Sequence, residues 1–162
     1  MKAAQRATAT VASLLAALAL PASARACELV LSEHRSAREL LRLPLDPAAP
    51  RAHIAFTHSV LGTPVSDHYV WRHDAGQWRA HLVEERFEGE GYGLPQAAAA
   101  GETLQRDGDG WRLRLDRVVQ PLVVLPLPSQ HMRVVVAGRP PVQLGDLSTH
   151  SILMRAQHCP PS

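Results

Sequence analysis

Residues with the chemistry of a polar site lie close together in the segment Phe56 to Tyr69, FTHSVLGTPVSDHY. An apolar, strand-like pattern ends at His58 and Ser59, a Gly-Thr-Pro turn follows, and Asp67 comes just after that turn. Because strand side chains alternate between two faces, His58 is expected on the inward face with the apolar residues before it. A hairpin would bring Asp67 beside His58, where a carboxylate would fix the tautomer of the imidazole.

This pair has more than one interpretation. In an enzyme of hydrolytic or metal-assisted type, His58 would act as a base and Asp67 would orient it. A serine triad with Ser59 is disfavoured, because adjacent strand residues diverge and the sequence has no G-x-S-x-G motif. A composite metal site would need His58, Asp67 and an outside ligand such as Glu84, without the spacing typical of zinc sites. A purely structural pair is the remaining alternative.

A second dense stretch, Arg86 to Pro95 (RFEGEGYGLP), has glycine at every other position. Glycine permits backbone angles that other residues avoid and lets a ligand or another segment come close. No Gly-Lys-Ser/Thr follows, so this is not a phosphate-binding loop. An irregular sheet edge is the alternative interpretation. Together the two stretches predict a binding site lined by His58, Ser59, Asp67, Tyr69, Gly91, Tyr92, Gly93 and Pro95.

The elements that would position these residues are short apolar segments separated by turn-forming residues, with no long helical period between them. This pattern predicts an all-β fold, an antiparallel β-sandwich or open barrel. Residues 34–41 could begin as a helical turn. Residues 96–101 could form either a short helical turn or a surface loop. Strands are expected at 29–31, 39–43, 52–58, 68–73, 78–87, 111–115, 122–125, 132–136 and 151–154.

The N-terminal residues have the features of an export signal. A short basic region precedes the apolar run Val11 to Leu20, and Ala24-Arg25-Ala26 forms an A-x-A cleavage site. The apolar run is much shorter than the roughly 20 residues that cross a bilayer. We therefore expect a cleaved signal peptide at 1–26, a single β-rich domain at 27–162, no membrane-spanning segment in the mature chain, and a periplasmic or secreted location.

The cysteine and charge content agree with export. Cys27 and Cys159 are the only two cysteines, and in an oxidising compartment they are expected to form a disulfide. Lipidation of Cys27, directly after the predicted cut, is the alternative. Lys2 is the only lysine, and once residues 1–26 are removed the arginines no longer outnumber the 15 acidic residues. No basic patch remains to bind nucleic acid.

The two motifs together resemble a bacterial family, domain of unknown function 1850 (DUF1850). Its members are small exported proteins often encoded beside the fused permease of TAXI-type TRAP transporters. The chain departs from the family pattern in having Asp67 where Glu is commoner, and Tyr92 where a small residue is commoner. The matching positions are His58, Ser59, Val60, Pro64, Val65, Asp67, Tyr69, Gly91, Gly93, Leu94 and Pro95.

The resemblance implies an exported accessory or binding protein associated with a TRAP-type transporter system. Our leading hypothesis is that this protein is non-enzymatic and needs no cofactor. Its partner would be a transporter component or a small-molecule ligand. For a carboxylate ligand, Arg72 or Arg86 would supply the guanidinium fork. A small His/Asp enzyme and a purely structural exported β-domain are the alternatives.

Overall fold

The computed structural model describes residues 26–161, so the predicted signal peptide lies almost wholly outside the described residues. The described chain is nearly all β, as predicted, with a single short helix and one 3₁₀ turn. No helix in this part of the chain is long and apolar enough to span a bilayer. The elements are β1 (Glu28–Glu33), β2 (Glu39–Pro44), β3 (Arg51–Thr57), β4 (Pro64–Asp74), β5 (Gln77–Phe87), β6 (Thr103–Asp107), β7 (Gly110–Val119), β8 (Leu122–Val124), η1 (Pro128–Gln130), β9 (Arg133–Val135), β10 (Val142–Gln143), α1 (Leu144–Leu147) and β11 (Ile152–Gln157).

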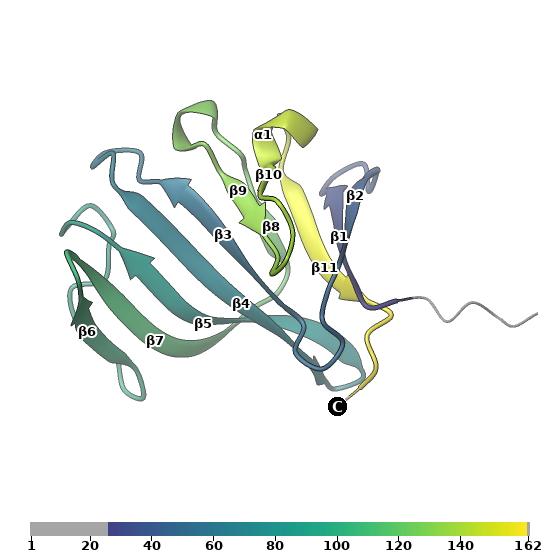
Figure 1. The fold of residues 1–162 in the computed structure, drawn as a ribbon, viewed down its shortest axis with the longest axis horizontal. Helices are drawn as coiled ribbons and strands as arrows, with labels where there is room; N and C mark the ends of the chain where they lie inside the picture. The colour runs from purple at the N-terminus through teal and green to yellow at the C-terminus, as the bar shows by residue number, and fades with distance from the viewer. Residues whose placement is uncertain (1–25, 162) are drawn as a thin grey trace, which may run out of the picture.

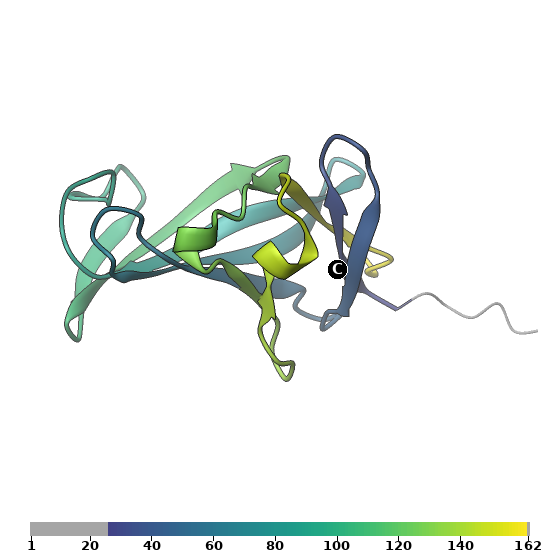
Figure 2. The same cartoon turned by 90° about the horizontal axis from the view of Figure 1, so that it is seen from above.

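The strands form two antiparallel sheets, arranged as a sandwich-like single domain (Figures 1 and 2). The smaller sheet has the order β2-β1-β11-β8, and the larger has the order β10-β9-β3-β4-β5-β7-β6. Figure 1 shows β1, β2 and β11 near one end of the larger sheet, with β6 and β7 at the far end. The larger sheet therefore extends well beyond the smaller one.

Alternation of apolar and polar side chains explains why these segments form half-buried strands. In β7, Leu113 and Leu115 are buried, whereas Arg114 between them is exposed. This is the pattern of a strand with one face on the core and the other in water. The core lies between the sheets and includes Leu29, Leu31, Ile54, Trp71, Leu113, Leu122, Val134, Ile152 and Met154.

The predicted disulfide is present. Cys27 and Cys159 are bonded and both are buried. They flank the antiparallel pair β1 and β11, in which Glu28 lies opposite Gln157. The bond therefore joins the two ends of the domain beside strands that already pair.

Some boundaries differ from those expected. β4 begins at Pro64 instead of His68, because proline is tolerated at the first position of a strand. The stretch 34–41 forms a turn and then the start of β2, and residues 96–101 form no helix. The sequence did not predict β6, β10 or α1, which are short and carry little alternation.

Candidate functional site

Strand register places two carboxyl groups side by side on the inner face of the larger sheet. Asp67 in β4 lies opposite Ile54 in β3 and opposite Glu85 in β5. Glu85 in turn lies opposite Leu113 in β7. Cross-strand partners share a face, and Ile54 and Leu113 are among the most buried residues of the core. Asp67 and Glu85 therefore project toward the core side and not toward open solvent.

These carboxyl groups border a cavity of about 240 Å³. The next row of the same face, Phe56, Val65 and Phe87, supplies apolar walls. Segments outside the sheet complete the lining: the two residues that follow β3, the glycine-rich loop after β5, and the last residue of η1. The residues from those segments are His58, Ser59, Tyr92, Gly93, Leu94, Pro95 and Gln130.

His58 connects the β3–β4 turn to the glycine-rich loop. Its Nδ1 accepts hydrogen bonds from the backbone N–H groups of Val60 and Leu61, each at 3.2 Å. Its Nε2 lies 3.2 Å from the carbonyl oxygen of Tyr92. Because Nδ1 accepts, Nε2 must carry the proton and donate to that carbonyl. The ring is thus fixed as one neutral tautomer by three backbone groups.

The prediction that His58 and Asp67 pair directly is therefore wrong, although both residues border the same cavity. The turn brings its own N–H donors to Nδ1, and the loop brings a carbonyl to Nε2, so neither ring nitrogen is left for the carboxylate. Asp67 forms no side-chain hydrogen bond within residues 26–161. His58 organises the backbone around the cavity in this arrangement.

The glycine-rich loop depends on left-handed backbone angles. Gly89, Gly91 and Gly93 have φ of 94°, 77° and 92°, and Tyr92 between them has φ of 52°. Glycine adopts these angles without strain, whereas a bulky residue such as Tyr92 does so at a cost. At Gly89 a Cβ would also lie 2.9 Å from Cδ1 of Leu61. The alternating glycines thus let the loop turn tightly against the β3–β4 connection.

The carboxyl pair is held in an environment that disfavours charge. Burial and, as the smaller cause, the neighbouring Glu85 together raise the pKa of Asp67 to about 7. The pKa of Glu85 is also raised, by burial first and by Glu102 in addition, against the lowering effect of Arg117. Burial and the same two carboxyl groups raise the pKa of Tyr69. Near neutral pH, Asp67 therefore exists as a mixture of protonated and ionised forms.

Most of the predicted site residues border this cavity, but two do not. Tyr69 is a core residue with 6% exposure, and Gly91 lies in the loop, where its carbonyl accepts the N–H of Leu94. The sequence interpretation missed Glu85 and Gln130. Glu85 is recognisable only from strand register, because a β-bulge shifts the pairing of β4 with β5 and so brings Glu85 opposite Asp67.

Other residues considered for the site lie elsewhere. Glu84 is on the opposite face of the sheet from Asp67 and pairs with Arg86 at 2.6 Å, so the composite metal site with His58 does not form. Arg72 pairs with Asp116 at 2.6 Å. Neither Arg72 nor Arg86 borders the cavity, so neither supplies a fork for a carboxylate there.

We expect His58→Ala to lower the free energy of unfolding by about 1–2 kcal/mol, because it removes the acceptor of two backbone N–H groups and the donor to Tyr92. Hydrogen exchange in residues 88–95 should become faster. His58→Asn is the matched variant, because an asparagine oxygen can still accept from the turn but its shorter side chain does not replace the bond to the loop. It should recover stability more than loop protection. Unchanged exchange in both variants would contradict this role of His58.

Comparison with protein families identifies the family to which this chain is similar. The family described as "Domain of unknown function (DUF1850)" matches residues 53–141, more than half of the chain. The matched region begins within β3 and continues past β9, and it contains the glycine-rich loop and every residue that lines the cavity. No curated protein and no solved structure matches the chain.

Proposed function

We propose that this chain, which belongs to the DUF1850 family, is an exported accessory protein. It would bind a small molecule in the cavity beside Asp67 and Glu85. We propose further that it works with a TRAP-type uptake system and catalyses no reaction itself. The transporter association rests on the motif resemblance, whereas the binding role rests on the geometry of the cavity.

One observation supports binding most strongly. Three segments converge on one concave surface: the residues that follow β3, the β4–β5 pair, and residues 92–95 of the glycine-rich loop. The surface combines apolar walls with a few polar groups, which is the usual composition of small-molecule sites. Its floor holds two carboxyl groups that have no hydrogen-bond partner of their own within residues 26–161.

The lining indicates the chemistry of the ligand. No arginine borders the cavity, and both titratable groups on its floor are carboxyls. A ligand that donates hydrogen bonds or carries a positive charge would satisfy them, whereas a carboxylate would be repelled. The volume of about 240 Å³ is below the usual range for drug-sized ligands, which favours a compact molecule. The ligand is therefore proposed to be a small cation or neutral donor.

The enzymatic alternative receives less support from this arrangement. A general base needs a ring nitrogen within reach of the proton that it removes. Both ring nitrogens of His58 are occupied by backbone groups of the turn and the loop. A binding role requires no such free nitrogen.

Blocking the cavity mouth tests the binding role. Ser59 is exposed and borders the cavity, so Ser59→Trp should fill the mouth without disturbing the core. Thr149→Trp is the control, because Thr149 is exposed in the turn before β11 and borders none of the cavities described here. Wild type and the control are purified under native conditions from the periplasmic or secreted fraction. Both should release the same small molecule on denaturation. The Ser59→Trp protein should release at least about tenfold less.

Mass spectrometry of the released small molecules is the measurement. Equal release from all three proteins, or none from any, would leave the cavity without a binding role. The transporter association is tested separately, by purifying the tagged wild-type protein from detergent-solubilised membranes. Recovery without any transporter subunit counts against that association but not against binding.

A further inference from the structure

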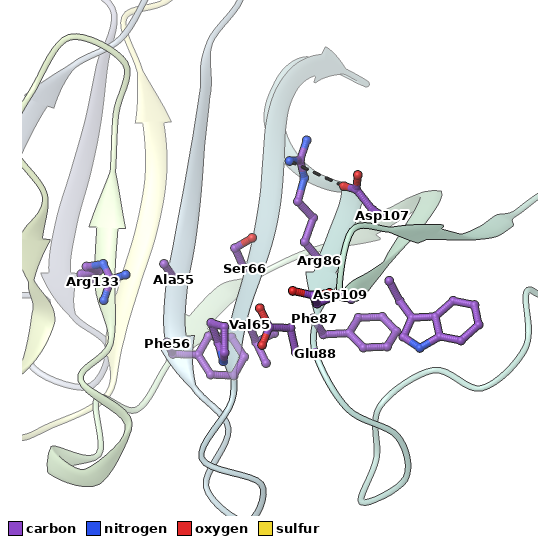
Figure 3. A pocket seen from close by; sticks show the side chains of 13 residues that line it. Ala55, Phe56, Val65, Ser66, Arg86, Phe87, Glu88, Asp107, Asp109 and Arg133 are labelled. Atoms are coloured by element: carbon purple, nitrogen blue, oxygen red, sulfur yellow. Dashed lines mark ion pairs between the residues drawn. The ribbon is translucent and has the colours of Figure 1, made fainter.

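The outer face of the larger sheet carries a trough on the side opposite the candidate site. Register places Arg133, Ala55, Ser66 and Arg86 in one row across β9, β3, β4 and β5. Because the two middle residues are small, the row is low at its centre and flanked by long side chains. A cavity of about 390 Å³ lies over it (Figure 3).

Arg133 differs from every other arginine of residues 26–161. It is half-buried, yet its side chain forms no ion pair and no hydrogen bond. The other two half-buried arginines both have carboxylate partners, Arg79 with Asp74 and Arg112 with Asp107. The remaining unpaired arginines are exposed to water. A half-buried guanidinium that lacks a partner and borders a cavity is available to an anionic group.

The charge of Arg133 acts on this face of the sheet. His53, in the neighbouring row of β3, has a lowered pKa, caused by burial first and then by Arg133 and Arg86. The His53 ring stacks on that of His68, with ring centroids 4.7 Å apart, and Ser66 hydrogen-bonds to His68 at 3.2 Å. The centre of the trough therefore lies beside two imidazoles and a hydroxyl, and the charge of Arg133 is one cause of the lowered pKa of His53.

The opposite end of the trough is acidic. Glu88 and Asp109 border it and form no ion pair within residues 26–161. Arg86 and Asp107 also border it, but Arg86 pairs with Glu84 at 2.6 Å and approaches Asp107 to 4.0 Å, so their charges are compensated. Figure 3 shows Arg133 on one side of Ser66, with Asp109 toward the other. The free charges at the two ends are thus of opposite sign.

We propose that this trough binds a small zwitterionic molecule, with its carboxylate on Arg133 and its ammonium group facing Glu88 and Asp109. The arginine fork matches a planar carboxylate with two parallel hydrogen bonds. The backbones of β9 and β5 are three strand spacings apart, about 14 Å, which leaves room for a short carbon chain once the side chains reach inward. Ala55 lies in the middle of the outer row and borders the trough, where its methyl group would contact the methylene groups.

Three six-carbon probes separate the parts of this proposal: 6-aminohexanoate is the zwitterion, hexanoate has the carboxylate alone, and adipate has a carboxylate at each end. We expect 6-aminohexanoate to bind most tightly, hexanoate more weakly, and adipate most weakly, because its second carboxylate meets Glu88 and Asp109. Binding is followed by NMR titration of the arginine Nε–Hε and backbone amide signals, which gives a stoichiometry and a Kd for each probe.

Arg133→Gln should weaken 6-aminohexanoate by about tenfold or more, because it removes a charge-assisted pair. Arg155→Gln, at an exposed position of β11 in the other sheet, should leave Kd unchanged. Arg133→Lys keeps the charge without the fork and should give an intermediate loss, which also guards against a variant that fails to fold. Glu88→Gln combined with Asp109→Asn should remove the preference for the zwitterion over hexanoate.

The proposal is overturned if no probe gives a saturable shift, if adipate binds as tightly as 6-aminohexanoate, or if Arg133→Gln and Arg155→Gln behave alike. The test is independent of the proposed function. Ser59→Trp blocks the inner cavity and should not change the Kd of any probe for the outer trough. The two sites can therefore fail separately.

Discussion

A variant in which Cys27 and Cys159 are both replaced by serine should lose about 2–5 kcal/mol of unfolding free energy. The bond closes a loop with a sequence separation of 132 residues, for which the chain-entropy estimate is about 5 kcal/mol. The double variant is preferred to a single one, because a lone thiol would remain free to react. Urea unfolding of the oxidised wild type, the reduced wild type and the double variant measures the effect.

The reduced wild type should resemble the double variant, since both lack the covalent link. The first region to lose protection from hydrogen exchange should be β1 and β11, because the disulfide lies at their paired ends. An unfolding free energy that is the same with and without the bond would show that pairing of β1 with β11 alone holds the two ends together.

Asp67→Asn should make the protein more stable at pH 8, by an amount on the order of 2–4 kcal/mol. The pKa of Asp67 is about 7 in the folded protein, against about 3.9 in an unfolded chain. A raised carboxyl pKa means that the folded state holds the proton more tightly. The stabilising contribution is therefore complete below about pH 4 and is lost as the pH rises toward 7. Asparagine removes this loss, because it never ionises.

Urea unfolding of wild type and Asp67→Asn at pH 4 and pH 8 measures this difference. The two proteins should be close in stability at pH 4 and should diverge at pH 8. Asp146→Asn, a change at an exposed carboxylate in α1, is the control and should have little effect at either pH. A divergence that is absent, or that is larger at pH 4, would mean that the charge on Asp67 is well solvated.

The sequence predicts the fold because alternation and turn residues are local signals. Leu113, Arg114 and Leu115 show the period of a half-buried strand, and the structure confirms it. Short elements such as β10 carry too few residues for any period to be visible. Which residues lie together on the inner face depends on how the strands pair, including their register and β-bulges. That information is not contained in any single segment.

The same distinction explains what sequence reasoning could predict of the site. It identified both segments that meet at the cavity, because His58 and the alternating glycines are unusual in their own local context. It assigned His58 the wrong hydrogen-bond partner, because it considered the nearest carboxylate and not the backbone groups of the turn and of the loop at Tyr92. It missed Glu85, whose position beside Asp67 depends on an irregular strand pairing. Arg133 is distinguished by its lack of a partner among the described residues, which only the structure shows.

Asp67 lies in a cavity that disfavours its charge. Titration of its side-chain carboxyl carbon by NMR in the folded protein tests this most directly. We predict a midpoint at about 7, which falls in the Glu85→Gln variant because the neighbouring charge is removed. A midpoint near the ordinary value of about 3.9, unchanged by Glu85→Gln, would contradict the account.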